Sequence, residues 1–325
     1  MSVVKSRWPL ILVFMSAFGF SIQSLIVKVL FQQGFSGSIQ CVFARGIIQL
    51  VTSSLILYYD SDRRAGKAPR LFGDTNFITL MLFLRTIVGF GGVAFSFLSV
   101  EHLPIGDSTV LQNLSPVFAT IGSYFALGES WRLPEFVATV LSLVAAVLVA
   151  RPPSLFGGGD GDSSSSSSNV LGLFYAFMAA FTAGLAYLCI RILGTTAKIP
   201  WPNILFAQSL GQMFLSFPSM YVFGEKVTLM NITGYEYLLI ISSGLMGTVS
   251  QIAMTVGMQR EKSANATVVR MSEVLFGFMW QVLLTDDRVN LLSVLGSVLI
   301  TAGVMIIVIF KQSDEQTTEK QKKKN

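Results

Sequence analysis

Four ionisable side chains fall well inside long apolar stretches of this sequence, whereas Lys28 and Arg191 lie at the ends of such stretches: the four are Arg45, Arg85, Arg270 and Glu273. A charged side chain at the centre of a bilayer costs at least about 2.5–3.5 kcal/mol, so a charge retained there is a candidate for function. Arginine presents a planar fork of N–H donors that matches carboxylate and phosphate groups. Because three arginines accompany a single carboxylate, the pattern favours binding of a small anion, with Glu273 as a candidate for proton coupling.

The same residues also have purely structural explanations. Arg270 and Glu273 are three positions apart, so on one helix they share a face and can pair with each other. Arg45 can anchor its helix to neighbouring backbone carbonyls. Both explanations stay open. Neutral amides in the apolar stretches complete the set of candidates for substrate contact, although such amides often only bond a neighbouring helix: Gln112, Asn113, Gln208 and Gln251.

The composition predicts a membrane protein. Apolar residues make up 52% of the chain and charged residues only 13%, whereas a soluble domain carries about 25% charged residues. The apolar residues form runs long enough to cross a hydrocarbon core of about 30 Å. In lipid such runs must be helical to satisfy their own backbone groups. The sequence therefore predicts an all-α integral membrane protein.

Other classes of site find no support in the residue types. The formal net charge of +5 comes from basic residues scattered among loops, without the basic and aromatic patch of a nucleic-acid-binding protein. Cys41 and Cys189 lie in or beside apolar runs, with no spacing for a disulfide framework or a metal site. No catalytic constellation is visible. We therefore expect no enzyme activity, no cofactor and no nucleic-acid partner.

The apolar runs predict ten membrane-spanning helices in two groups of five. The groups form repeats over residues 1–150 and 170–310. Between them, residues 151–169 are rich in Pro, Gly and Ser and predict a flexible linker, and residues 311–325 predict a disordered basic tail. The expected helices are Trp8–Phe31, Ser38–Tyr59, Asn76–Ser99, Ile105–Leu127, Leu133–Ala150, Val170–Leu193, Pro202–Phe223, Gly234–Gly257, Ala264–Thr285 and Asn290–Phe310.

The arrangement of these helices predicts an inverted repeat. An even number of helices places both termini on one side of the membrane. With the termini in the cytoplasm, most basic loop residues also fall inside, as the positive-inside rule requires. Each group of five then enters the membrane upside down relative to the other. Inverted repeats are typical of secondary transporters, whose substrates bind near the midplane between the halves.

In each group of five, one apolar stretch is interrupted by polar residues. These stretches are Gly106–Trp131 in the first group and Ser263–Arg288 in the second. The first has a neutral side chain and a proline, Asn113 and Pro116, where the second has Arg270 and Glu273. Pro116 removes one intrahelical hydrogen bond and predicts a kink in the fourth helix. A site between these two helices would carry most of its charge on one side.

Several motifs resemble one family of carriers. They are a Phe-x-Arg that ends at Arg45, the segment FLRTIVGFGGVAFSFLSVEHLPIGD, and Pro-Val-Phe followed by Leu-Gly-Glu at 116–118 and 127–129. Together they resemble the EamA-type drug/metabolite transporter superfamily, and the segment is most similar to the G branch of solute carrier family 35. The second half departs from the pattern, with Ser272-Glu273 where Ser-Pro is usual.

The resemblance implies a ten-helix carrier that works by alternating access through a central cavity between the repeats. We expect a secondary active transporter of a small organic metabolite, with an anion favoured by the arginines. The alternative is a non-transporting membrane adaptor or regulator that retains the carrier fold. Nucleotide sugars, amino acids and drugs remain alternative substrate classes. Proton or counter-substrate coupling, and a monomer or a homodimer, also remain open.

The carboxyl terminus bears on localisation. Lys322 and Lys323 match a dilysine signal for retrieval to the endoplasmic reticulum, on a tail expected in the cytoplasm. The alternative is a basic tail attracted to anionic lipid. We therefore expect a multi-pass protein of the plasma membrane or an endomembrane.

Overall fold

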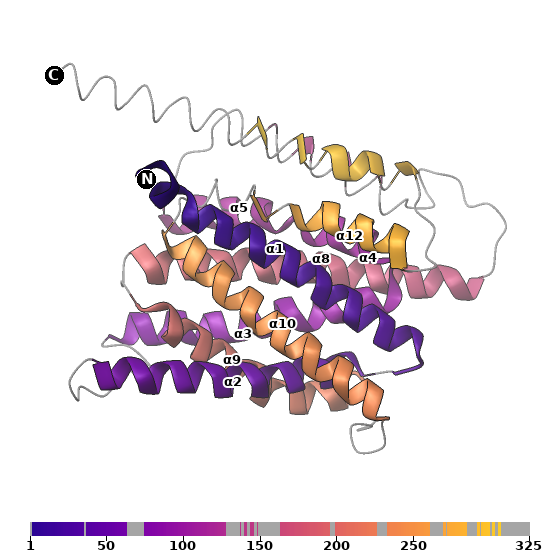
Figure 1. Ribbon diagram of the computed structural model, residues 1–325. Helices are drawn as coiled ribbons and strands as arrows, with labels where there is room; N and C mark the ends of the chain where they lie inside the picture. The colour runs from indigo at the N-terminus through magenta and orange to yellow at the C-terminus, as the bar shows by residue number, and fades with distance from the viewer. Residues whose placement is uncertain are drawn as a thin grey trace.

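Every element of regular secondary structure in the described residues is an α-helix (Figure 1). The computed structural model describes residues 2–35, 37–63, 75–127, 163–195, 199–225, 233–260, 269–270 and 272–284, with shorter pieces between residues 137 and 148 and between residues 291 and 306. The helices are α1 (Ser2–Gln32), α2 (Ser38–Arg63), α3 (Asn76–His102), α4 (Ile105–Gln112), α5 (Ser115–Leu127), α8 (Ser163–Thr195), α9 (Trp201–Val222), α10 (Gly234–Arg260) and α12 (Ser272–Leu284).

The all-helical architecture predicted from the sequence is confirmed. In the described residues, five helices are long and apolar enough to cross a membrane, and each lies where a spanning helix was expected: Trp8–Gln32, Ser38–Tyr59, Asn76–His102, Val170–Gly194 and Gly234–Arg260. The expected helices Leu133–Ala150 and Asn290–Phe310 are described only in short pieces, and the tail with its two lysines lies outside the described residues. Ten spans and cytoplasmic termini therefore stay predictions.

The fourth expected helix is wrong as a single element. The structure has two helices there, α4 and α5, separated at Asn113 and Leu114. The break has a backbone cause, because Pro116 has no N–H to donate to the carbonyl oxygen of Gln112 four residues earlier. The Asn113 side chain also donates to the Thr109 carbonyl oxygen at 2.8 Å, which caps the end of α4. The polar interruption is therefore a turn between helices rather than a kink within one.

The expected linker is also shorter than predicted. Helix α8 begins at Ser163, so its first residues belong to the serine run assigned to the linker over 151–169. Serine is only moderately unfavourable in a helix, at about 0.5 kcal/mol relative to alanine, so an apolar helix that starts at Val170 can extend backwards through serines. The remainder of the linker, up to residue 162, lies outside the described residues.

Helices of the first half (α1–α5) pack directly on helices of the second half (α8–α12). In Figure 1 α1 lies alongside α10, and two further extensive cross-half contacts join α2 with α9 and α3 with α8. In addition, α5 packs on α8 as α12 packs on α1. Each described helix of the first half has a counterpart in the second: α1 corresponds to α8, α2 to α9, α3 to α10, and α4 with α5 to α12. When every helix is replaced by its counterpart, these same pairs of helices are in contact. An approximate twofold axis between repeats gives this pattern.

Two glycines allow helices of opposite halves to approach closely. A Cβ added at Gly257 of α10 would lie 2.9 Å from the Pro9 carbonyl oxygen of α1. A Cβ added at Gly211 of α9 would lie 2.8 Å from the Thr86 carbonyl oxygen of α3. Small residues serve this purpose in membrane proteins because they bring backbones together. Neither carbonyl can move without bending its helix, so both glycines are needed for packing.

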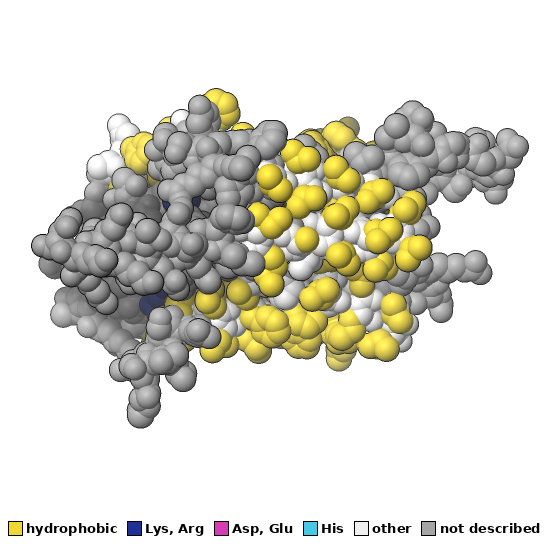
Figure 2. Space-filling model, turned by 90° about the horizontal axis from the view of Figure 1, so that it is seen from above, with side chains coloured by type: hydrophobic (Ala, Val, Ile, Leu, Met, Phe, Trp, Pro, Cys, Tyr) yellow, Lys and Arg dark blue, Asp and Glu magenta, His cyan; other side chains and the backbone are white. Residues whose placement is uncertain are grey.

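Apolar side chains cover the outside of the described bundle. Large apolar side chains on many of the described helices are more than half exposed, among them Val51 (56%), Phe83 (61%), Phe217 (60%) and Val249 (62%). Figure 2 shows one face, on which the described surface is mainly apolar. In water such a surface is unfavourable by about 25 cal/mol per Å², whereas lipid tails remove that penalty. The surface therefore suits a bilayer.

One end of the bundle is held by a carboxylate that bridges the halves. Beyond the end of α9, Glu225 accepts hydrogen bonds from the backbone N–H groups of Ile39 at 2.8 Å and Gln40 at 3.3 Å. Both N–H groups belong to the first turn of α2, which offers them no acceptor within the helix and where a negative charge is favourable. Ser38 donates to Glu101 of α3 at the same place. Glu225 thus caps a helix of the opposite half.

Loss of this cap should open the start of α2. Cys41 lies in the first turn of α2 and is only 1% exposed. In a Cys189→Ala background, Glu225→Ala should accelerate maleimide labelling of Cys41 in detergent roughly 2- to 30-fold, because a lost cap costs about 0.5–2 kcal/mol. Glu225→Gln keeps an acceptor oxygen and should show a smaller increase. Equal labelling rates in all three proteins would show that Glu225 does not hold the helix end.

Candidate functional site

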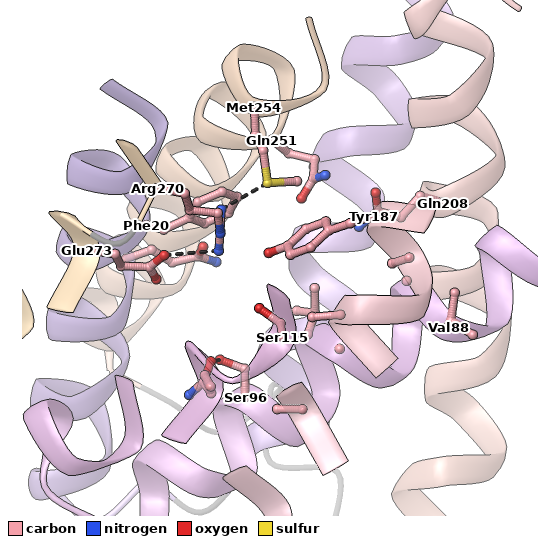
Figure 3. A pocket seen from close by; sticks show the side chains of 18 of the residues that line it. Phe20, Val88, Ser96, Ser115, Tyr187, Gln208, Gln251, Met254, Arg270 and Glu273 are labelled. Atoms are coloured by element: carbon pink, nitrogen blue, oxygen red, sulfur yellow. Dashed lines mark hydrogen bonds and ion pairs between the residues drawn. The ribbon is translucent and has the colours of Figure 1, made fainter. Parts of the chain in front are cut away.

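A cavity in the middle of the bundle brings together residues from both halves (Figure 3). All eight residues predicted for substrate contact lie on its wall, on α2, α3, α4, the turn after α4, α9, α10 and the start of α12: Arg45, Arg85, Gln112, Asn113, Gln208, Gln251, Arg270 and Glu273. The structure thus places them at one site. Their role in binding stays a prediction.

Arg45 ties three helices together. Its side chain is 2% exposed. Nη1 donates to Gln23 Oε1 of α1 at 3.2 Å, and Nη2 donates to Gln251 Oε1 at 3.3 Å and to the Gly247 carbonyl oxygen at 3.4 Å, both on α10. All three acceptors are neutral, so the positive charge has no carboxylate beside it among the described residues. This geometry matches the anchoring role that we kept open for Arg45.

Arg85 has much of its hydrogen-bonding capacity unused. It is also 2% exposed, and Nη2 donates to Gln208 Oε1 of α9 at 2.7 Å. Its Nε and Nη1 are buried and have no partner among the described residues. A buried donor left unpaired costs about 1–3 kcal/mol. Of the three cavity arginines, Arg85 therefore gains most from a bound acceptor.

Arg270 and Glu273 form an ion pair across one turn. The distance from Nη2 to Oε2 is 2.9 Å. The Arg270 guanidinium also lies between two rings, with its Cζ 4.9 Å from the centroid of Phe20 and 5.5 Å from that of Tyr187, and Nη1 contacts the Met254 sulfur at 2.9 Å (Figure 3). The pairing that we kept as a structural alternative is therefore present, and it neutralises this charge.

The amides beside α4 are occupied by local contacts. Gln112 Nε2 donates to Ser108 at 2.7 Å and to Ser99 at 3.1 Å, while its Oε1 accepts from Ser96 at 2.7 Å. Asn113 donates to the backbone of α4. Both side chains face the cavity, but their hydrogen bonds shape its wall. We conclude that they are less available to a ligand than Arg85.

Sequence reasoning missed two wall residues that the arginines depend on. Gln23 is an amide in the middle of an apolar stretch of α1, which was a usable signal because buried polar side chains in lipid need partners. Phe20 carried no such signal, because a phenylalanine in a spanning helix usually faces lipid or packs. The structure reveals its place at the site, on the cavity wall and with the guanidinium groups of Arg45 and Arg270 over its ring.

On the described cavity wall, every fully buried side-chain polar atom without a partner is a hydrogen-bond donor. These atoms are Gln23 Nε2, Arg45 Nε, Arg85 Nε, Arg85 Nη1 and Gln251 Nε2. The charge has the same bias, with three guanidinium groups and one carboxylate on that wall. A ligand that offers acceptors and negative charge satisfies both. The arrangement suits an anion.

Removing Arg45 and Arg85 should affect stability differently. Arg45→Ala leaves buried acceptors on α1 and α10 without a donor and should lower the free energy of unfolding by roughly 1–3 kcal/mol. Arg85→Ala removes a charge with two unpartnered nitrogens and should be neutral or stabilising without ligand. The measurement is the midpoint of thermal unfolding in detergent. An equal or larger loss with Arg85→Ala would contradict the division of roles between the two arginines.

Comparisons with known proteins agree with this architecture. The profile of the EamA-like transporter family matches residues 7–151 and 170–309 of the chain. A solved structure, described only as a crystal structure of a protein, superposes with a TM-score of 0.61 at 16% identity and covers 93% of this chain and 98% of its own. At that identity the likeness supports the fold alone.

Named relatives are membrane carriers. Solute carrier family 35 member G1 of Homo sapiens is 27% identical over 293 residues, which are 89% of this chain and 75% of the relative. The Mus musculus protein is 26% identical over 278 residues, 84% of this chain and 70% of the relative. The pseudopaline exporter CntI of Pseudomonas aeruginosa (strain UCBPP-PA14) is 26% identical over 300 residues, 91% and 94% of the two chains. With most of its length matched by the family profile, this chain belongs to the EamA-like transporter family, whose members are multi-pass membrane transporters rather than enzymes.

Proposed function

We propose that the protein is a secondary active transporter that carries a small organic anion by alternating access, with the anion bound in the central cavity. Family membership supports transport as the activity. We infer an anionic substrate from the buried atoms on the cavity wall that have no partner, because all of them are hydrogen-bond donors. A cation or a neutral acceptor-poor molecule would leave these donors unsatisfied.

Arg85 is the proposed primary contact for the anion. The Arg270 charge is already balanced by Glu273, and Arg45 is engaged with three neutral acceptors. Arg85 has a single neutral partner, Gln208, and two nitrogens to spare. In a low-dielectric cavity a charge–charge hydrogen bond is roughly twice as strong as a neutral one, so a carboxylate or phosphate group gains most at this position.

The position of the cavity supports the proposal of alternating access. Its wall draws on both halves, and the bonds that cross between the halves beside it join arginines to neutral amides: Arg45 to Gln251 and Arg85 to Gln208. Bonds of this kind contribute less than buried ion pairs, so they can be exchanged during rocking of one half against the other. Because the two halves are inverted repeats, rocking can give two equivalent arrangements of the halves around the cavity, one open to each side of the membrane.

Flux measurements test this proposal. The purified protein in liposomes should take up at least one member of a labelled panel comprising lactate, succinate, glutamate, inorganic phosphate and UDP-glucose. Arg85→Ala should reduce the ratio of turnover to KM for that anion by about 10- to 100-fold, as expected for the loss of a hydrogen bond to a charged group worth about 1.5–3 kcal/mol.

The matched control removes an arginine outside the cavity. Arg260 lies over the Trp8 ring at 4.7 Å, at the far end of α10, and Arg260→Ala changes the net charge by the same amount. It should leave flux within about twofold. Absence of flux for every anion of the panel would overturn the anionic class, and absence of flux for cationic and neutral solutes as well would overturn the carrier assignment and favour the adaptor alternative. Flux of cations alone would overturn the anionic class.

The same liposomes distinguish the modes of coupling. If protons drive uptake through Glu273, an imposed pH gradient should accelerate uptake by the unmodified protein but not by Glu273→Gln. If the carrier is an exchanger, preloading the liposomes with unlabelled anion should accelerate uptake in both proteins, and the pH gradient should have no effect in either.

A further inference from the structure

The Arg85 guanidinium lies in space that a side chain at position 89 would occupy. Gly89 follows Arg85 by one helical turn on α3, so the two share a face of the helix. An added Cβ at Gly89 would overlap Arg85 Nη1, and it would lie 3.3 Å from Arg85 Cζ and 3.2 Å from Gln208 Cγ. The guanidinium therefore lies against its own helix, in a notch that only glycine leaves open.

We propose that Gly89 is a positioning residue for substrate binding, because it holds Arg85 in the orientation that reaches both Gln208 and the cavity. This proposal rests on the proposed function of Arg85 as the anion contact. An arginine side chain has about 2 kcal/mol of rotamer entropy to lose, and a notch that accepts one orientation limits that freedom before the anion arrives. Glycine inside a helix is unfavourable by about 0.5–1 kcal/mol relative to alanine, a cost consistent with a specific use at position 89.

Helix packing does not account for this glycine. At Gly257 and Gly211 an added Cβ would meet a backbone carbonyl oxygen of a helix from the other half. At Gly89 the three nearest atoms all belong to two flexible side chains, Arg85 with its Nη1 and Cζ and Gln208 with its Cγ. Those atoms can move without any shift of the helices. Gly89→Ala should therefore keep the fold and displace the guanidinium.

The first test needs no substrate. Alanine in place of a helical glycine raises stability by about 0.4–1 kcal/mol when it fits, which corresponds to roughly 1–3 °C in the unfolding midpoint. Gly89→Ala should give this gain in an Arg85→Ala background and a smaller gain, or a loss, with Arg85 present. The matched control is Gly92→Ala, where an added Cβ would meet nothing closer than Ala183 N at 3.6 Å. It should give the same shift in both backgrounds.

The second test uses whichever panel anion the unmodified protein transports. Gly89→Ala should raise its KM by about tenfold and change the maximal rate less than twofold, as expected when an interaction of the bound ground state is lost. Gly89→Ala should add nothing to the defect of Arg85→Ala. A structural role alone would not produce this dependence on Arg85.

The outcomes separate the two proposals. If no panel anion is transported, the proposed function fails, and the thermal measurements still decide whether Gly89 positions Arg85. If an anion is transported but Gly89→Ala leaves KM unchanged, or if its thermal shift is the same with and without Arg85, the role of Gly89 is overturned while the carrier assignment stands.

Discussion

The burial of guanidinium charge in a membrane protein governs this structure. Arg45 and Arg85 are each 2% exposed, and neither has a carboxylate partner among the described residues. A charge in lipid is tolerated only where side chains, carbonyls or water surround it. The amides of Gln23, Gln208 and Gln251 provide that environment, and their positions on α1, α9 and α10 require the two halves to meet at the cavity.

The bonds across the cavity follow the relation between the halves. Aligning α2 with α9 so that Phe43-Ala44 falls on Phe206-Ala207 places Arg45 on Gln208. Each bonds to a helix of the opposite half, Arg45 to Gln251 of α10 and Gln208 to Arg85 of α3. The same kind of bond thus recurs with donor and acceptor exchanged, and both arginines belong to the first half. The two halves therefore have similar folds but place different charges at the cavity. Such an asymmetric distribution of charge is what recognition of an asymmetric solute requires.

Sequence patterns predicted much of the fold because membrane helices obey local rules. The length of each apolar run locates α1, α2, α3, α8 and α10 without reference to any partner, since a lipid-embedded backbone must bond within its own segment. Local rules were insufficient at Asn113, where the chain stops one helix and starts another, and at Ser163, where a helix extends into a polar run. At both places, small backbone preferences compete with the packing of neighbouring elements.

The sequence by itself determined that charged and amide side chains occur within apolar helices, because insertion energies make each of them conspicuous wherever it stands. Only the tertiary structure decided which of them have partners. Arg45, Arg85 and Arg270 look alike in sequence, yet one ties helices together, one retains free donors and one pairs with Glu273. The notch at Gly89 was likewise invisible, because its meaning depends on where the end of another side chain lies. Hydrogen-bond satisfaction depends on distances between helices far apart in the chain, and no local pattern encodes those distances.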